Sequence, residues 1–312
     1  MAIKIIANGY YRSGTTLLGS ILKDSLKGSL CFYEPLNPTL SLLVKNEAKT
    51  KKKHFLHNKL LFEDYYKLDE ETLRKILISN PNLNQNGIGS VKELLEYFDL
   101  YENLGKEVIL QTNRPHFFLK YIFDRYNNKT IHIVRHPLDI LNSMEHTITK
   151  DEYTSKRVIR FLTKKLVYKK LFEVNKEFRW IVKHLGYPFE HFDKWEIKYF
   201  YTKRFFKKFV LVWVMSNYFA LKDLEKINGK LVVYENLVRE PNKVCKEMSE
   251  YLGKNIIYKE KIIENNHFKF RKGEMKTFLK VVKKLKIEDE FNFINEKVRE
   301  SDLDYVECKF LK

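Results

Sequence analysis

The sequence is poor in cysteine, and it lacks long apolar runs. Cys31, Cys245 and Cys308 show no CxxC pair and no Cys/His ligand spacing, so neither a disulfide framework nor a zinc site is expected. No stretch reaches the roughly 18 consecutive apolar residues that a membrane-spanning helix needs. The chain enters an apolar run at Ile3, so we expect no signal peptide before the fold. Together these absences predict a soluble protein of a reducing compartment, by default the cytoplasm.

Acidic residues are also in short supply. The 312-residue chain has 58 Lys+Arg against 40 Asp+Glu, a formal net charge of +18. Its 44% hydrophobic residues are typical of a folded globular protein, and its length allows one large core or two modest ones. The positive charge favours an anionic partner: a nucleotide, an acidic glycan, an anionic lipid surface or nucleic acid. A lysine-rich solvated surface without such a partner is the alternative explanation.

The N-terminal segment carries the clearest pattern in the chain. Ile3–Ala7 is an apolar run of strand length, and residues 9–16 (GYYRSGTT) form a glycine-bounded loop. Apolar residues then recur at helical spacing from Thr15 to Lys27, with Gly28 as the stop. A strand, a glycine loop and a helix in this order form a phosphate site, because loop and helix N–H groups point at the anion.

One residue separates this loop from a Walker A loop. The spacing Gly9-x4-Gly14-Thr15-Thr16 matches, but Thr15 stands where the lysine should be. A kinase or ATPase needs that lysine on its β- and γ-phosphates, so we expect a different phosphate-bearing nucleotide. Arg12 becomes the nearest fixed cation. An atypical P-loop phosphotransferase using ATP stays as an alternative, although no Asp/Glu pair stands out as a magnesium site.

Short apolar runs alternate with helical patterns along the chain. The predicted strands are Ile3–Ala7, Leu30–Tyr33, Glu107–Thr112, Thr130–Val134 and Leu231–Tyr234. The alternation predicts an α/β fold: a mostly parallel central sheet of about five strands flanked by helices, with a P-loop-like nucleotide-binding architecture. We expect a single domain spanning residues 1–312. Residues 45–53 (KNEAKTKKK) are expected to form an exposed loop or lid.

Residues 151–210 differ in character from the rest of the chain. They hold 16 Lys/Arg against 7 Asp/Glu, with aromatic residues interleaved throughout. We expect a basic, aromatic, helical insertion in the domain. Such a surface suits peripheral contact with a membrane. It also leaves open a nucleic-acid-binding protein without catalysis, although no helix-turn-helix, zinc-finger or RNP-type pattern supports that reading.

Three separated segments resemble, in order, the motifs of sulfotransferases that use 3′-phosphoadenosine 5′-phosphosulfate (PAPS). They are residues 11–16 (YRSGTT), 131–143 (IHIVRHPLDILNS) and 231–241 (LVVYENLVREP). The resemblance implies transfer of the sulfuryl group from PAPS to an acceptor hydroxyl or amine, leaving adenosine 3′,5′-bisphosphate, without a metal. It also implies that the first loop surrounds the phosphosulfate, through Arg12, Ser13, Gly14, Thr15 and Thr16. Arg12 would then stabilise the charge on the leaving phosphate.

The second motif resembles the family's site for the 3′-phosphate of the donor. It implies that Arg135, at a strand end, binds this phosphate as a bidentate guanidinium, and that Ser143 adds a hydroxyl. Arg271, Lys272 and Gly273 are similar to a further 3′-phosphate element of the cytosolic members. The tryptophan and asparagine that should follow are missing, so a solvated basic turn is an equal alternative.

The general base departs from the cytosolic pattern. Those members carry a Lys-Thr-His-x-Pro segment, but the matching stretch here is QTNRP (residues 111–115), with Asn113 at the histidine position. Asparagine cannot take a proton at neutral pH. The Golgi carbohydrate and tyrosine sulfotransferases instead use a glutamate that follows the phosphate loop, and Glu34 resembles it. We therefore expect Glu34 to be the general base, with His116 as the second candidate. The aromatic residues of the insertion suggest a carbohydrate or glycolipid acceptor, and its charge an anionic one.

Overall fold

The computed structural model describes residues 1–51, 53, 59–81, 90–150, 181, 200–259 and 272–303. The chain divides into two compact units. Unit 1 comprises Met1–Val134 and Phe219–Ile263, and unit 2 comprises Arg135–Tyr218 and Glu264–Lys312. Most of the segment 151–210 lies outside the described residues, so the expectation of one domain with a basic insertion stays a prediction.

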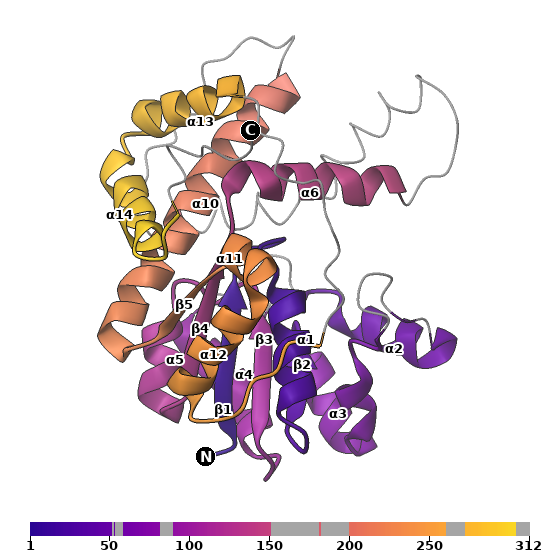
Figure 1. Cartoon of the computed structure of the whole chain (residues 1–312). Coiled ribbons are helices and arrows are strands. Elements are labelled where there is room, and N and C mark those ends of the chain that lie inside the picture. Colours follow the sequence, from indigo (N-terminus) through magenta and orange to yellow (C-terminus); the bar gives the residue numbers. More distant parts are fainter. Residues whose placement is uncertain are drawn as a thin grey trace. The chain divides into compact units, whose positions relative to one another are not determined.

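Unit 1 is built on a five-stranded sheet in which every neighbouring pair is parallel. The strand order is β2-β3-β1-β4-β5, with β1 in the centre. The strands are β1 (Ile3–Gly9), β2 (Leu30–Tyr33), β3 (Val108–Thr112), β4 (Lys129–Val134) and β5 (Lys230–Val233). All five correspond to predicted strands, and the predicted α/β fold with a parallel sheet is confirmed (Figure 1).

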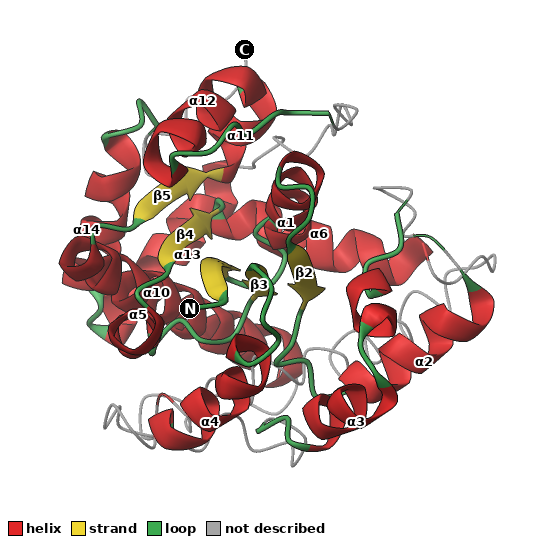
Figure 2. Ribbon diagram, turned by 90° about the horizontal axis from the view of Figure 1, so that it is seen from below, coloured by secondary structure: helices red, strands yellow, loops and turns green. Residues whose placement is uncertain are grey.

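Helices cover both faces of this sheet. One face carries α1 (Thr15–Ser25), α11 (Tyr234–Arg239) and α12 (Pro241–Leu252), and the other carries α4 (Val91–Glu102) and α5 (Leu119–Tyr126) (Figure 2). Beyond the β2 edge of the sheet lie α2 (Leu40–Thr50) and α3 (Glu70–Ile78) (Figure 2). The 3-10 helix η1 (Glu63–Lys67) contacts both β2 and α2. The carboxyl ends of the strands are therefore left for the loops that carry the candidate site.

Unit 2 is helical in its described part. It contains α6 (Pro137–Lys150), the first part of α10 (Phe200–Ile227), α13 (Lys272–Leu285) and α14 (Glu288–Arg299). Trp213 of α10 is fully buried, and its ring lies 5.9 Å from Phe278 and 6.3 Å from Phe291 between centroids. Trp213 is thus a core residue of this unit. None of the described helices is long and apolar enough to cross a membrane.

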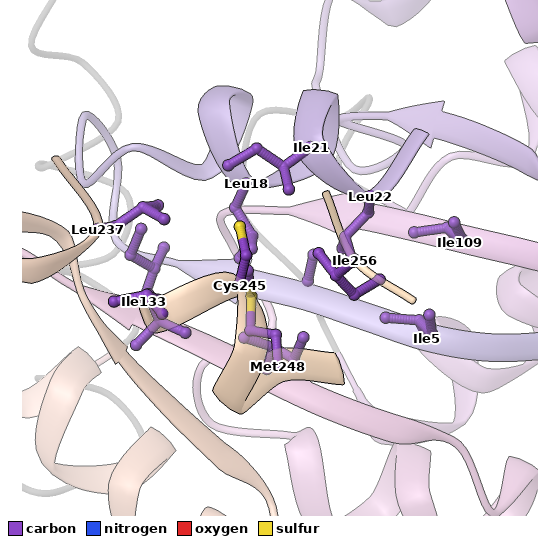
Figure 3. Close-up of a cluster of buried hydrophobic side chains, with 14 of the residues drawn as sticks. Ile5, Leu18, Ile21, Leu22, Ile109, Ile133, Leu237, Cys245, Met248 and Ile256 are labelled. Carbon is purple, nitrogen blue, oxygen red and sulfur yellow. The ribbon is translucent and has the colours of Figure 1, made fainter. Parts of the chain in front are cut away.

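An apolar cluster fixes α1 to the sheet of unit 1. Leu18 and Leu22 of α1 pack with Ile5 of β1, Ile133 of β4 and Met248 of α12 (Figure 3). These side chains are all buried, and each fully buried side chain of this size stabilises the fold by about 1.5–3 kcal/mol relative to exposure. The N-terminus of α1, where the phosphate loop ends, is therefore rigidly placed.

The expectation of a loop or lid at residues 45–53 was wrong for residues 45–50, because α2 extends through Thr50. Leu40, Val44 and Glu47 share the buried face of this helix. The Glu47 carboxylate accepts hydrogen bonds from the N–H groups of Leu61 (2.9 Å) and Phe62 (2.7 Å). The sequence did not reveal this buried face, because one of its residues, Glu47, is itself charged.

Candidate functional site

The phosphate loop is a tight turn that leads directly into α1. The Ser13 N–H donates to the carbonyl of Tyr10 (3.0 Å), and Gly14 is the N-cap of α1 with φ +100°. As a glycine, this N-cap residue has no side chain that could accept from the first-turn N–H groups. The N-terminus of α1 is therefore of the kind that binds an anion.

Gly14 is needed for space as well as for its backbone conformation. A Cβ atom at this position would overlap the ring of Tyr234, the first residue of α11. The loop therefore lies directly against an aromatic side chain from the end of β5. Glycine allows this close approach, and the ring in turn limits the movement of the loop.

Tyr33 links the phosphate loop to Glu34. Its hydroxyl lies 2.9 Å from Oγ1 of Thr16. Burial raises the pKa of Tyr33 well above its usual range, the neighbouring charge of Glu34 adds to this, and Arg12 opposes it. Arg12, Thr16 and Glu34 therefore all lie within interaction range of one phenol. Unit 1 brings together these three residues, which the sequence predicted as parts of one site.

The Glu34 carboxylate is buried and held on both oxygens. Asn113 Nδ2 donates to Oε1 (2.8 Å), and Asn37 Nδ2 donates to Oε2 (2.7 Å). Arg114 Nη1 lies 3.6 Å from Oε2. Glu34 is only 8% exposed, so these donors replace much of the hydration that its carboxylate loses on burial.

The turn that carries Glu34 is supported from behind. Asn80 Nδ2 donates to the carbonyls of Pro35 (3.1 Å) and Asn37 (2.8 Å). The hydroxyl of Tyr97, on α4, donates to the same Pro35 carbonyl (2.8 Å). Neighbouring elements thus fix the backbone around the candidate base.

Arg12 and Glu34 share an uncommon backbone conformation. Their φ angles are 65° and 46°, in the left-handed region that disfavours residues with a Cβ. Lys51 and Asn127 also have positive φ, but they cap the C-termini of α2 and α5, where this conformation is common. Such strain costs about 1–3 kcal/mol per residue and is concentrated at functional sites.

His116, the second candidate base, is fully buried in a polar cluster. Its Nδ1 lies 3.4 Å from Nδ2 of Asn8, which lies 2.9 Å from Nδ1 of His132. Burial lowers the pKa of His116 to about 3, the nearby charge of Arg114 adds to this, and a hydrogen bond with the Asn113 backbone opposes it. A histidine with so low a pKa is a weak proton acceptor at neutral pH.

The residues predicted for the 3′-phosphate belong to unit 2. Arg135 is the first residue after β4, and its carbonyl accepts a hydrogen bond from Nε1 of Trp213 (3.3 Å). Ser143 lies on α6. Lys272 and Gly273 open α13, and Arg271 lies outside the described residues.

Sequence reasoning missed the partners of Glu34. Asn113 was noted only because it replaces a histidine, while Asn37 and Tyr33 belong to no motif. The available signal was positional: Glu34 and Asn113 each follow a predicted strand, and neighbouring parallel strands end at one edge of the sheet. In the part of the chain that the structure describes, no group of three or more His, Cys, Asp or Glu residues could hold a metal ion.

Comparison with known proteins gives the family. The family described as sulfotransferase domain matches residues 3–301, and the chain belongs to this family. A curated relative, an uncharacterized protein of Archaeoglobus fulgidus, is 33% identical over 276 residues, which cover 81% of this chain and 84% of the relative. The predicted sulfotransferase family is thus confirmed, and with it a transferase.

Three solved sulfotransferase structures are similar at lower identity. The sulfotransferase from Alicyclobacillus acidocaldarius is 13% identical, with a TM-score of 0.43 over 91% of this chain and 94% of that one. The sulfotransferase domain of the Synechococcus PCC 7002 olefin synthase is 17% identical, with a TM-score of 0.37 over 82% of this chain and 74% of that one. The sulfotransferase domain from the curacin biosynthetic pathway is 18% identical, with a TM-score of 0.39 over 86% of this chain and 80% of that one.

Proposed function

We propose that this sulfotransferase moves the sulfuryl group from PAPS to a hydroxyl or amine of an acceptor. The observation that carries the proposal is that Tyr33 contacts Thr16, next to the phosphate loop, and also lies within interaction range of Arg12 and Glu34. A candidate anion site and a fixed carboxylate both lie next to Tyr33 in unit 1. This is the minimum that a base-assisted transfer from a phosphate leaving group requires.

The loop residues fit the phosphosulfate end of such a donor. Gly14 leaves room at the helix N-terminus, and Thr15 occupies the position at which an ATP-using enzyme needs a lysine. Ser13 is fully buried, and its hydroxyl finds no hydrogen-bond partner among the described residues. The donor supplies an activated sulfuryl group on a phosphate leaving group. Arg12, Ser13, Gly14, Thr15 and Thr16 would hold that group.

In the proposed step Glu34 takes the proton of the acceptor hydroxyl. The acceptor oxygen then forms the new O–S bond, while the bond between sulfur and the bridging oxygen breaks and its electron pair stays on the 5′-phosphate. Arg12 and the N–H groups at the start of α1 stabilise the charge that develops there. His116 is the weaker candidate for the base, because its pKa is about 3.

We assign the 3′-phosphate of the donor to Arg135 and Ser143. A guanidinium at the end of a strand suits a phosphate, because it donates two parallel hydrogen bonds. Arg271, Lys272 and Gly273 are a further candidate element for the same phosphate. The nucleotide product of the proposed transfer is adenosine 3′,5′-bisphosphate.

For the acceptor we propose a carbohydrate or glycolipid, anionic in character, that contacts residues 151–210. Aromatic faces suit sugar rings, and the basic surplus of this segment suits negative charge. Peripheral contact with a membrane through the same residues, and a cytoplasmic location, are part of the proposal. Neutralising lysines in this segment should weaken acceptor binding and leave donor binding intact. Unchanged acceptor affinity would contradict this assignment.

The test of the base is Glu34→Gln, with Glu107→Gln as the matched control. Glu107 forms an exposed ion pair with Lys254, away from the proposed machinery. Radiolabelled PAPS and a panel of neutral and acidic oligosaccharides and glycolipids report transfer, and calorimetry with adenosine 3′,5′-bisphosphate reports binding. Glu34→Gln should lose transfer about 100-fold or more while retaining nucleotide affinity. Undiminished turnover would shift the role to His116.

A further inference from the structure

Asn113 and Glu34 are brought together by the pairing of two neighbouring strands. Glu34 follows β2 and Asn113 follows β3, and Tyr33 pairs with Gln111 in the parallel register. The Glu34 N–H continues this ladder by donating to the Gln111 carbonyl (2.8 Å). The position of the Asn113 amide, 2.8 Å from Glu34 Oε1, is therefore set by the sheet itself.

Arg114 fixes which way the Asn113 amide faces. Its Nη1 donates to Asn113 Oδ1 over 2.6 Å. The amide nitrogen must then point at the Glu34 carboxylate, because the reversed amide would place Oδ1 against a carboxylate oxygen and lose both bonds. Asn113 and Arg114 are 2% and 9% exposed, so water does not readily replace either bond.

The opposite carboxylate oxygen, Oε2, accepts a hydrogen bond from Asn37 Nδ2 (2.7 Å). The amides of Asn113 and Asn37 thus form a clamp on the Glu34 carboxylate. An ionised carboxylate has about four acceptor sites on its two oxygens. Two amide donors therefore fix its orientation and still leave sites for the proton of an incoming hydroxyl. The clamp therefore holds the carboxylate in one orientation.

We propose that Asn113 is a positioning residue for Glu34: its amide, oriented by Arg114, holds the Glu34 carboxylate aligned for proton transfer. This inference rests on the proposed function of Glu34 as the base. The residue that stands at the histidine position of the cytosolic pattern thus serves the base, although it cannot be one itself.

The test uses two substitutions that differ in donor capacity and hardly at all in volume. Asn113→Asp keeps the shape of the side chain but replaces the donor with an acceptor, whereas Asn113→Ala removes the side chain. Asn128→Asp and Asn128→Ala are the matched controls. Asn128 is equally buried, and its amide donates to Thr130 Oγ1 (2.8 Å). It lies at the amino end of β4, whereas Glu34 lies at the carboxyl end of β2.

The first measurement is the kcat and the KM of sulfuryl transfer, with radiolabelled PAPS and the panel of oligosaccharides and glycolipids. The second measurement is the affinity for adenosine 3′,5′-bisphosphate by calorimetry. Thermal unfolding of each variant reports any loss of folding. A positioning role lowers kcat and leaves KM and nucleotide affinity unchanged.

In Asn113→Ala we expect kcat to fall about tenfold, because the carboxylate loses one of its two amide donors and with it a fixed orientation. In Asn113→Asp the fall should be larger, because an acceptor then faces the Glu34 carboxylate in place of the donor. KM and the affinity for adenosine 3′,5′-bisphosphate should stay unchanged. The Asn128 variants should leave kcat unchanged.

A purely structural role for Asn113 gives the reverse order. The isosteric Asn113→Asp would then be milder than Asn113→Ala, and neither would lower kcat beyond the Asn128 variants. That result overturns the inference. If Glu34→Gln loses transfer while the Asn113 variants match the controls, the positioning role alone fails. If Glu34→Gln retains full transfer, the assignment of Glu34 as the base fails and the inference with it, so the two failures are distinguishable.

Discussion

Oγ1 of Thr16 lies 2.9 Å from the hydroxyl of Tyr33. Thr16 lies in the first turn of α1 beside the phosphate loop, and Tyr33 is the last residue of β2, directly before Glu34. This contact ties the proposed anion site to the proposed base through one pair of side chains. It gives the two parts of the proposed reaction a fixed separation, which transfer between positioned groups requires.

Breaking this bond should affect turnover more than folding. We expect Tyr33→Phe and Thr16→Val each to destabilise the protein by about 0.5–1.5 kcal/mol and to lower the rate of transfer, with little further loss in the double variant. A double-mutant cycle on transfer rates measures the coupling. Tyr126→Phe, which removes bonds to Leu95 and Asp99 on α4, is the control and should show no coupling to Thr16→Val. Strictly additive effects of Tyr33→Phe and Thr16→Val would show that the bond does not link the two parts.

Gly14 and Gly28 allow backbone strain to be separated from steric overlap. Both have φ +100°, but a Cβ at Gly28 would meet nothing within 4 Å, whereas one at Gly14 would overlap Tyr234. Gly28→Ala should cost about 1–2 kcal/mol of stability, the usual penalty of a left-handed residue, with nucleotide affinity intact. Gly14→Ala should bear the same penalty and also displace the loop, which should weaken binding of adenosine 3′,5′-bisphosphate at least tenfold. Thermal unfolding and calorimetry measure the two quantities, and equal nucleotide affinity in both variants would contradict the role of the loop.

His116 predicts a specific loss of stability in mild acid. Burial lowers its pKa from 6.5 to about 3, so the folded protein keeps it neutral while the unfolded chain binds a proton below pH 6.5. Its contribution to stability is thus complete above pH 6.5 and declines as the pH falls toward 3, by about 2 kcal/mol at pH 5. Denaturant unfolding at pH 8 and pH 5 should show a smaller decline in His116→Gln than in the wild type. An unchanged pH dependence would mean that His116 is protonated in the folded protein.

The sequence predicted the sheet well because buried parallel strands are short and apolar on both faces. Residues 30–33 and 130–134 needed no knowledge of their neighbours to be recognised. The phosphate loop was also predicted, since glycine spacing alone defines its turn. The parts of the site that local patterns describe were therefore available before the fold was known.

The support of Glu34 could not be predicted, because it depends on which strands are neighbours. Asn113 is far from Glu34 along the chain, and only the order β2-β3-β1 places their strand ends side by side. The left-handed backbone of Glu34 has no sequence signal either, since glutamate rarely adopts it. The same limit explains the error at residues 45–50. This charged segment is helical and partly buried because distant backbone N–H groups donate hydrogen bonds to Glu47.

The central claim is that the donor carries a 3′-phosphate bound by Arg135. Calorimetric titrations with adenosine 3′,5′-bisphosphate, adenosine 5′-phosphate and ATP–magnesium test it directly, in the wild type and in Arg135→Ala. Arg125→Ala, which removes an exposed ion pair with Asp99, is the control. We expect the bisphosphate to bind most tightly, and Arg135→Ala to weaken it at least tenfold while leaving adenosine 5′-phosphate unchanged. Tighter binding of ATP–magnesium, or no loss of bisphosphate affinity in Arg135→Ala, would contradict the claim.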